Sequence, residues 1–345
     1  MSQLLDISEV TASTEALRPR LEQQLGEHFG SPCTIVRLTR RPSEYHSSYP
    51  IEELNLVLAD GTSLDLIFKN LSESALLAGA QAAKPQLIRN PRREIEIYRS
   101  ILSLVKLGTP TFYGAQDDER NQEYWLFIED VPGLELYQVG EIFAWQEAAR
   151  WLARMHSCFR DRVSELEDNS NLLNHDREFY WTWISRAKKF AQSDSLEARN
   201  EIEKLFSGFD SVVEMLTQLP RTLIHGEFYA SNILVEQTSD GLRVCPVDWE
   251  MAGVGPGLMD LAALVSGNWT DNERREIARA YHQTMTESEV RGLAEPEFWT
   301  ALDYCRLALA VQWLGWSRSW TPPLDHQHDW RKEALELSAK LGIGR

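Results

Sequence analysis

The sequence predicts an α+β protein with two lobes, a small strand-rich N-terminal lobe and a larger, mainly helical C-terminal lobe. Short alternating apolar runs dominate the first 130 residues after an initial helix, whereas long helical patterns dominate the remainder. Between them, at about 127–133, a buried-looking strand ends in acids and then Pro-Gly. Strands first and helices afterwards are typical of α+β folds. We therefore expect lobes at 1–130 and 131–345, joined by a hinge at about 127–133.

Composition and charge are those of a soluble globular protein. A chain of 345 residues is long enough to build two hydrophobic cores. The formal net charge of -17 disfavours nucleic acid as a partner, because a phosphate backbone would be repelled. Four scattered cysteines, an N-terminus without signal-peptide features and the lack of a transmembrane-length apolar run favour a cytoplasmic protein. We expect a monomer or homodimer with no membrane partner.

The N-terminal lobe is expected to contain a helix at about 14–29 and a β-hairpin at 51–70. The two halves of the hairpin alternate in hydrophobicity and meet at Asp60-Gly61, a frequent turn pair. Successive side chains of a strand point to opposite faces, so the apolar positions of the second strand share one face and Lys69 lies on the other. Lys69 is thereby placed on a defined sheet face close to the end of its strand.

A second helix is expected in NPRREIEIYRSILSLV. Asn90 suits the N-cap and Pro91 the first helical position. At helical spacing Glu94 lies along the apolar stripe, whereas Glu96 points to water. A carboxylate at the edge of an apolar stripe needs a partner, and Lys69 is the candidate.

The C-terminal lobe is expected to be helical apart from one short hairpin. Helical patterns occur at 145–156, from Phe179 onward, in IEKLFSGFDSVVEML and in DYCRLALAVQWLGWS. Apolar strands at 232–236 and 242–247 flank a turn at Asp240-Gly241. This hairpin would place Asn232 at the start of one strand and Asp248 just past the end of the other.

The segment HGEFYASNIL (225–234) has the spacing of a kinase catalytic loop, with Glu227 two residues after His225 and Asn232 five residues after the acid. Phosphoryl transfer needs a carboxylate at the acceptor hydroxyl, oxygen ligands for Mg²⁺ and a cation on the phosphates. Asn232 and Asp248 are suited to be the oxygen ligands. Each residue alone could be a capping Asn, a solvated Asp or a core His. Their order, with Lys69 and Glu94 upstream, favours the chemical role.

Over most of its length the chain resembles the aminoglycoside phosphotransferase and choline kinase-like family, which has a bilobal protein-kinase-like fold. The motifs that carry this resemblance are FKNL, REIEIYRSIL, LFIEDVPG, WLARMH, HGEFYASNILV, VDWEMAGVG and MDLAAL. The resemblance implies a small-molecule kinase that uses ATP, with GTP as an alternative nucleotide, and Mg²⁺. Asp-Trp-Glu at 248–250 and the lack of an Ala-Pro-Glu segment disfavour a protein kinase.

The resemblance also implies how the nucleotide is held. Lys69 would contact its phosphates and pair with Glu94. The hinge backbone around Phe127, Glu129 and Val131 would hold the adenine.

In the C-terminal lobe, the resemblance places Glu227 at the catalytic-acid position beside His225. Asn232 and Asp248 would bind magnesium, and Asp260 would brace the catalytic loop.

Two departures from the family pattern stand out. The expected phosphate-covering loop, RRPSEYHSSYPIEEL, has no glycine, so Ser47 and Ser48 are the candidates for phosphate contacts, with a polar surface turn as the alternative.

Glu227 stands where the family has aspartate, which moves the carboxylate by roughly 1 Å, a shift that can cost about 100-fold in rate. A loose transition state depends on positioning and charge more than on base strength, so we expect an active enzyme. A non-catalytic, nucleotide-binding pseudokinase that acts as a partner module is the alternative.

The acceptor is expected to be a small molecule with a hydroxyl group, such as an amino sugar, an aminoglycoside-like compound or an amino alcohol. Aromatic faces attract cations, and Trp181 and Trp316 lie in tryptophan-rich stretches. Glu250 and Asp271 would add negative charge to the acceptor pocket. HQHD (326–329) is expected to be surface sequence rather than a metal site. His156 is expected to make a structural hydrogen bond.

Overall fold

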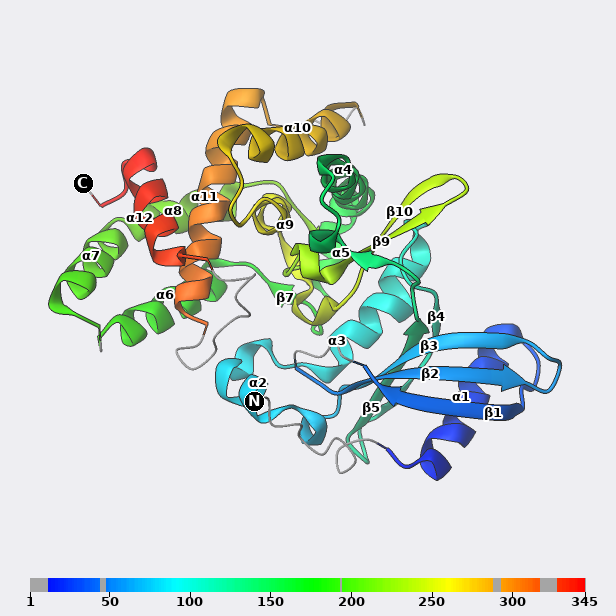
Figure 1. The fold of residues 1–345 in the computed structure, drawn as a ribbon. Helices are drawn as coiled ribbons and strands as arrows, with labels where there is room; N and C mark the ends of the chain where they lie inside the picture. Colours follow the sequence, from blue (N-terminus) through cyan, green and yellow to red (C-terminus); the bar gives the residue numbers. More distant parts are fainter. Residues whose placement is uncertain (1–11, 44–47, 193, 288–292, 317–327, 345) are drawn as a thin grey trace. The chain divides into compact units, whose positions relative to one another are not determined.

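A computed structural model describes residues 12–43, 48–192, 194–287, 293–316 and 328–344 (Figure 1). The chain divides into two compact units, Met1–Pro132 (unit 1) and Gly133–Arg345 (unit 2). Unit 1 is built on a sheet and unit 2 is mainly helical, which confirms the predicted α+β class. Within the described residues, no helix combines the length and the apolar character needed to cross a bilayer.

Unit 1 contains one antiparallel five-stranded sheet with the order β1-β2-β3-β5-β4. Its strands are β1 (Ile35–Pro42), β2 (Ile51–Leu58), β3 (Ser63–Asn70), β4 (Phe112–Asp118) and β5 (Glu123–Glu129). The predicted hairpin is confirmed as β2 and β3. Its register sets Lys69 opposite Ile51 and Asp65 opposite Asn55, so these four residues share one sheet face.

The other face of this sheet packs against α1 (Thr14–Phe29), which has the predicted bounds. Ser13 caps the start of the helix through its side chain, and Gly30 ends it in the left-handed conformation with φ of 69°. The core between helix and sheet is formed by Leu17, Leu21, Leu25, Leu54, Leu56, Leu66, Phe68, Trp125 and Phe127, among others. The apolar alternation of β2 and β3 therefore determines which face is covered.

The predicted second helix begins as expected and then changes its winding. Asn90 caps α3 (Pro91–Glu96), and its side chain accepts a hydrogen bond from the amide of Arg92. The chain continues as a π-helix (Ile97–Ile101) and a 3₁₀ turn (Leu102–Leu104). Glu94 is buried as expected, whereas Glu96 is half-buried rather than fully exposed. The remaining helical turns of unit 1 are Glu73–Ala75, α2 (Ala78–Ala83) and Gln86–Ile88.

Unit 2 is built mainly from helices. These are α4 (Ile142–Phe159), α5 (Val163–Glu167), α6 (Arg177–Ala191), α7 (Leu196–Ser207), α8 (Phe209–Gln218), α9 (Leu258–Leu264), α10 (Asp271–Glu287), α11 (Glu295–Leu314) and α12 (Trp330–Leu341). The predicted helical patterns fall in α4, α6, α7, α8 and α11. Helix α11 is at the centre of the packing, because it contacts α6, α8, α9 and α12.

Two small sheets of unit 2 position the segments that carry the predicted chemistry. The order β10-β9-β6 joins β6 (Leu134–Glu135), β9 (Ile233–Thr238) and β10 (Gly241–Pro246), and it confirms the predicted hairpin. The order β7-β11-β8 joins β7 (Leu173–Asn174), β8 (Arg221–Ile224) and β11 (Gly253–Pro256). Strand β8 ends one residue before His225, and β9 begins one residue after Asn232.

Candidate functional site

The predicted cation of unit 1 forms a buried ion pair. Lys69 Nζ donates a hydrogen bond to Glu94 Oε1 at 2.7 Å, and the two residues are only 5% and 2% exposed. The sheet places Lys69 near the end of β3, and the capped first turn of α3 presents Glu94. Glu94 thereby fixes the position of the Lys69 charge, and contact of this charge with a phosphate group stays a prediction.

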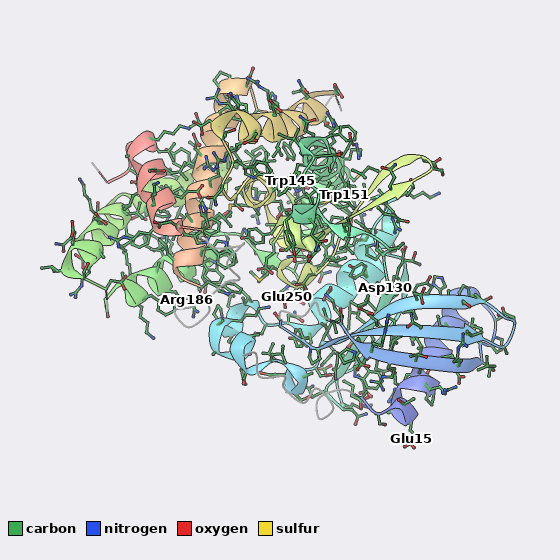
Figure 2. The ribbon with its side chains drawn as sticks, in the orientation of Figure 1. Glu15, Asp130, Trp145, Trp151, Arg186 and Glu250 are labelled. Carbon is green, nitrogen blue, oxygen red and sulfur yellow. The ribbon has the colours of Figure 1, made fainter. Side chains whose placement is uncertain are left out.

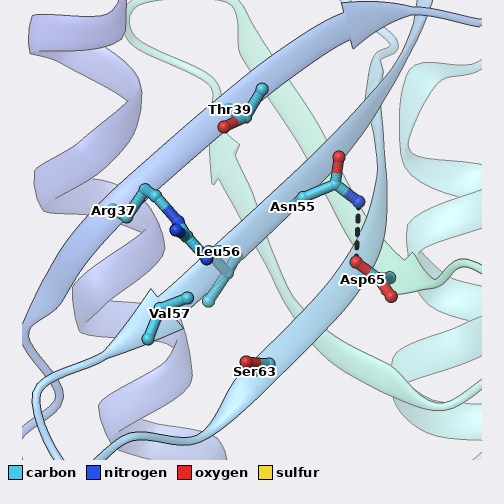
Figure 3. Close-up of a pocket in the computed structure, with 7 residues that line it drawn as sticks. All are labelled: Arg37, Thr39, Asn55, Leu56, Val57, Ser63 and Asp65. Carbon is cyan, nitrogen blue, oxygen red and sulfur yellow. Dashed lines mark hydrogen bonds between the residues drawn. The ribbon is translucent and has the colours of Figure 1, made fainter.

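The face of the unit 1 sheet that carries Lys69 is hollowed further along the strands (Figure 3). This hollow has a volume of about 270 Å³ and is lined by Arg37, Thr39, Asn55, Leu56, Val57, Ser63 and Asp65. Asn55 Nδ2 donates to Asp65 Oδ1 at 2.6 Å across it. Lys69 does not line the hollow, so the hollow itself is not the predicted phosphate contact.

The predicted adenine contacts lie at the end of β5. Phe127 is fully buried and stacks on Phe68 with ring centroids 5.3 Å apart. Glu129 accepts hydrogen bonds from the backbone amide and the hydroxyl of Thr111 at 2.9 and 3.0 Å. Because the Phe127 side chain is in the core, it is not free to contact a base, and the adenine contact through the backbone of this stretch stays a prediction.

Ser48 is anchored at the end of the glycine-free loop. Its carbonyl accepts a hydrogen bond from the amide of Leu77 at 2.9 Å, and its hydroxyl accepts one from Lys84. Ser48 and Lys84 are 4% and 8% exposed. Ser47 lies outside the described residues.

In unit 2, the start of the predicted catalytic loop is bound by Asp260 of α9. The amide of His225 donates to Asp260 Oδ2 at 2.7 Å, and the amide of Gly226 donates to Oδ1 at 2.8 Å. Asp260 is 1% exposed. Each oxygen of one carboxylate thus holds one peptide group, which fixes both the position and the orientation of the loop.

Asp260 is itself oriented by His156 of α4. The His156 Nε2 atom lies 3.3 Å from Asp260 Oδ2, and its Nδ1 lies 2.9 Å from the hydroxyl of Tyr281. A neutral imidazole satisfies both contacts when Nε2–H donates to the carboxylate and Nδ1 accepts from the phenol. His156 therefore has the structural hydrogen bonds expected of it.

The His225 ring links the loop to the segment that precedes Asp248. Its Nε2 lies 3.0 Å from the carbonyl oxygen of Val247, and its Nδ1 accepts a hydrogen bond from the amide of Glu227 at 3.3 Å. One neutral tautomer, protonated at Nε2, makes both bonds. His225 is fully buried, and Trp249 packs on it with ring centroids 4.4 Å apart.

The glycine of the loop is required by its surroundings. Gly226 has φ of 84°, and a Cβ atom at this position would lie 2.2 Å from the carbonyl oxygen of Met251. Both the conformation and the space therefore exclude a side chain here.

Backbone contacts position Glu227 and Asn232. The carbonyl oxygen of Glu227 accepts from the amide of Tyr229 at 2.7 Å and from Asn232 Nδ2 at 3.0 Å. Since the amide nitrogen of Asn232 points into the loop, its Oδ1 is directed away, and no described residue donates to this oxygen. Glu227 is half-buried, and its backbone is thus joined directly to the side chain of Asn232.

Asp248 has a strained backbone. It has φ of 66° and ψ of 64°, a conformation that residues other than glycine seldom adopt and that is concentrated at functional sites. It precedes a 3₁₀ turn (Trp249–Met251) anchored by the fully buried Trp249.

The two predicted oxygen ligands in unit 2 are of a chemical type that suits a magnesium ion bound together with phosphates. Asn232 Oδ1 and the Asp248 carboxylate are hard donors of the kind Mg²⁺ prefers. In the described part of the chain, no cluster of three or more His, Cys, Asp or Glu residues is arranged to hold a metal. Two ligands from the protein are consistent with an ion that keeps water and substrate phosphate in its remaining positions.

The predicted acceptor residues have different surroundings. Glu250, labelled in Figure 2, is half-buried in the turn after Asp248. Trp316 is 8% exposed and stacks on Trp183 with ring centroids 5.5 Å apart.

Two other acceptor candidates have partners on their own helices. Trp181 lies 5.6 Å from Lys188 Nζ. Asp271, whose side chain is 95% exposed, pairs with Arg274 at 3.4 Å.

The HQHD stretch is only partly described, because His326 lies outside the described residues. His328 bonds to Glu333 of α12, and this carboxylate also accepts from Arg306 of α11 at 2.6 Å. The described half of the stretch therefore belongs to an ion-pair network between two helices.

Sequence reasoning missed one residue of the loop. Tyr229 lies between Glu227 and Asn232, and its hydroxyl accepts a hydrogen bond from Trp313 Nε1 at 2.7 Å. The only signal in the sequence was a second aromatic residue directly after Phe228 in the loop.

Comparison with solved structures gives full-length matches of low identity. A provisionally assigned aminoglycoside phosphotransferase from Ralstonia eutropha JMP134 is 16% identical, with 96% of this chain and 97% of that chain covered and a TM-score of 0.59. A GDP complex of an aminoglycoside 2′-phosphotransferase mutant is 14% identical, with coverage of 94% and 97% and a TM-score of 0.54. A microcompartment-associated aminopropanol kinase is 16% identical, with coverage of 88% and 90% and a TM-score of 0.53. These similarities establish the fold.

Comparison with curated protein sequences gives no match. The model of the phosphotransferase enzyme family, in contrast, matches residues 81–298. The matched range is more than half of the chain and includes Glu94, the 225–234 loop, Asp248 and Asp260. The chain therefore belongs to the phosphotransferase enzyme family.

Proposed function

We propose that the protein transfers the γ-phosphoryl group of ATP to a hydroxyl group of a small molecule in a Mg²⁺-dependent reaction. The observation that carries this proposal is the arrangement of the 225–232 loop. Asp260 and His225 bind its backbone, and the side-chain amide of Asn232 donates to the Glu227 carbonyl, which supports a role for the Glu227 carboxylate and the Asn232 amide oxygen in one site. This combination serves an acceptor hydroxyl and a cation, which are the two needs of phosphoryl transfer.

The proposed roles follow from the chemistry of each group. Lys69, held by Glu94, would neutralise the nucleotide phosphates. Asn232 and Asp248 would hold Mg²⁺, which when bound offsets the charge that develops on the transferred group. Glu227 would accept a hydrogen bond from the acceptor hydroxyl and orient its oxygen toward the γ-phosphorus. We propose that the proton of this hydroxyl passes to the Glu227 carboxylate as the new P–O bond forms and the bond to ADP breaks.

The decisive test is an acceptor screen with Asp248→Ala as the inactive reference. Purified protein would be incubated with Mg-ATP and a library of amino sugars, aminoglycosides, macrolides and amino alcohols, and phosphorylated products would be detected by mass spectrometry. We expect at least one product from the wild type and none from Asp248→Ala. The matched control is Asp161→Ala, which removes an exposed aspartate of the same unit and should retain full turnover. Full turnover by Asp248→Ala would remove the assigned magnesium ligand.

Glu227 is tested by changing its charge and its length separately. Glu227→Gln keeps the size and removes the charge, so transfer should fall by about 100-fold or more if the carboxylate orients the acceptor. Glu227→Asp keeps the charge and shortens the side chain, so a loss of about 10- to 100-fold is expected if the active geometry is adapted to glutamate. A wild-type rate for Glu227→Gln on a true acceptor would exclude the proposed role.

The screen also decides between an enzyme and a pseudokinase. Thermal-shift titrations with Mg-ATP and Mg-GTP would measure nucleotide binding independently of turnover, and GTP is included because one similar structure is a GDP complex. Binding of nucleotide without phosphorylation of any acceptor would favour the non-catalytic partner module. Any phosphorylated product excludes it.

A further inference from the structure

The side chains of Tyr229 and of its neighbour Phe228 pack against different helices. Phe228 is fully buried and stacks on Trp151 of α4, which Figure 2 labels, with ring centroids 5.8 Å apart. Tyr229 instead packs against Trp313 at the C-terminal end of α11, with ring centroids 5.7 Å apart. The phenol therefore connects the loop that carries Glu227 to a second element of unit 2.

The hydrogen bond between these two rings has only one possible direction. An indole N–H is a donor only, so Trp313 Nε1 donates and the Tyr229 oxygen accepts at 2.7 Å. The proton of Tyr229 must then point away from Trp313. No described residue accepts this proton, which leaves an oriented O–H donor two residues from Glu227.

Tyr229 is protonated throughout the neutral range, because a tyrosine hydroxyl ordinarily loses its proton only near about pH 10. It is therefore an O–H donor at the pH of the proposed reaction.

The position of Trp313 is itself held by its surroundings. Trp330 stacks on it with an interplanar angle of 9° and ring centroids 5.5 Å apart. Arg186 of α6, labelled in Figure 2, donates to the carbonyl oxygens of Gly315 and Trp316, each at 2.7 Å, and so anchors the end of α11. A donor held in this way is preorganised, and preorganised donors discriminate most strongly between ligands.

We propose that Tyr229 is an acceptor-binding residue, which donates a hydrogen bond to a second oxygen of the acceptor next to the hydroxyl that is phosphorylated. Trp313 is its positioning residue. The inference rests on the proposed function and narrows it, because it requires an acceptor with at least two oxygen functions close together. A site built to bond a substrate oxygen rejects analogues that lack it, since its own donor is then left without a partner.

The test compares an oxygen-rich acceptor with one that has a single hydroxyl. The probes are kanamycin and glucosamine on one side and 1-amino-2-propanol on the other, each with Mg-ATP. We expect the wild type to prefer an oxygen-rich probe. Tyr229→Phe should lower kcat/KM for that probe by about 10- to 100-fold, the loss of one buried hydrogen bond, while the KM for ATP stays unchanged. The residual rate on 1-amino-2-propanol should change by less than about threefold.

The other outcomes separate the inference from the proposed function. A Tyr229→Phe variant that retains wild-type kcat/KM on all probes, or that loses equally on all of them, overturns the inference alone. A wild type that phosphorylates only 1-amino-2-propanol also overturns it. Failure of the wild type to phosphorylate any of the probes or any member of the acceptor library refutes the proposed function and this inference with it.

Trp313→Phe tests the positioning role, because it keeps an aromatic ring and removes the indole N–H together with the five-membered ring that carries it. We expect a loss of about fivefold on the oxygen-rich probe, and no further loss when this change is added to Tyr229→Phe. The matched control is Trp145→Phe, which removes another indole donor, bonded to the carbonyl oxygen of Val139 at 3.3 Å in the same unit. The control should leave the ratio of the two acceptor rates unchanged. Additive losses in the double variant would overturn the role assigned to Trp313.

Discussion

Glu94 in unit 1 and Asp260 in unit 2 are almost equally buried, with 2% and 1% exposed, but different partners balance their charges. Glu94 accepts a hydrogen bond from a side-chain cation, Lys69, at 2.7 Å. Asp260 accepts from two backbone amides, those of His225 and Gly226. One carboxylate belongs to an ion pair, whereas the other holds a stretch of main chain.

This difference in partners determines which residues can replace each carboxylate. A buried ion pair consists of two replaceable side chains, and apolar residues of similar volume often give equal stability. Backbone amides cannot be replaced, so any residue at position 260 must supply acceptors for them. We infer that the pair in unit 1 is retained for its charge, while Asp260 is required by the fold of the loop itself.

The largest expected effect comes from breaking the ion pair on one side. Lys69→Met leaves a buried carboxylate without its cation, which should lower the free energy of unfolding by about 3–5 kcal/mol. The double variant Lys69→Met, Glu94→Leu has no charge left to neutralise, so it should recover most of the lost stability and still fail to bind nucleotide. Urea denaturation and ATP titration would measure the two quantities. A double variant as unstable as Lys69→Met would contradict the expectation that apolar residues can replace this ion pair.

Asp260→Asn should lower the free energy of unfolding by about 2–3 kcal/mol, since the new amide group offers one acceptor oxygen where the carboxylate offered two. One loop amide then faces an N–H group, and no second substitution can repair this. Thermal unfolding and acceptor turnover should both report the loss. The matched control is Asp329→Asn, which keeps an equally good cap for α12 and should be nearly neutral. If a second side-chain substitution restored the stability of Asp260→Asn, the proposed difference between the replaceable ion pair and the irreplaceable loop contact would be contradicted.

Gly226→Ala tests whether the loop backbone can shift toward or away from Asp260. The left-handed conformation alone costs about 1–2 kcal/mol for a residue with a Cβ, and contact with the Met251 carbonyl adds to this. The matched control is Gly241→Ala, which also has positive φ, of 121°, but no atom within 4 Å of its Cβ position. Both variants should be strained, yet only Gly226→Ala should lose turnover. Equal turnover of the two would mean that the amide positions are not critical.

Much of unit 1 could be predicted from the sequence because its signals are local. The period-2 alternation of residues 51–70 and the cap at Asn90 act within a few residues, and together they placed Lys69 and Glu94 on facing surfaces. The π-helix after Glu96 was not predicted, since α-helical and π-helical windings share the same apolar residues over one turn. Glu96, which was predicted to point to water, is half-buried at the end of α3.

In unit 2 the predictable part was the spacing of the loop motif and the β9–β10 hairpin. The sheet that contains β7, β8 and β11 was missed because its strands are two to four residues long and have no pattern of their own. The contact between Tyr229 and Trp313 joins residues 84 positions apart, so it depends on the packing of α11 and not on local sequence. The catalytic roles of the loop residues, Lys69 and Asp248 stay predictions.

Glu333 gives the test with the smallest expected effect. Like Glu94, it is a carboxylate whose charge is neutralised by side chains and not by backbone amides. Burial alone would raise the pKa of Glu333, but the bond from His328 and the charge of Arg306 outweigh burial and lower it. A carboxylate with a lowered folded-state pKa stabilises the protein at pH values above its unfolded-state pKa, and this contribution is lost as pH falls through the folded-state value. We therefore expect the contact between α11 and α12 to weaken progressively below about pH 4.5 in the wild type.

Glu333→Gln should remove this acid-sensitive contribution, which for one charge-assisted hydrogen-bonded contact is on the order of 1 kcal/mol. The thermal midpoint of the variant should be lower than that of the wild type at pH 7, and the difference should narrow as the pH falls below about 4.5. If the comparison holds, Glu333→Gln shifts stability in a pH-dependent way while acceptor turnover at pH 7 is preserved. Asp260→Asn, in contrast, should lower both stability and turnover at pH 7, because two partners of Asp260 are amides of the catalytic loop. A difference in thermal midpoint that stays constant from pH 7 through the acid range until the wild type itself unfolds would show that packing of the Glu333 side chain, and not its charge, joins the two helices.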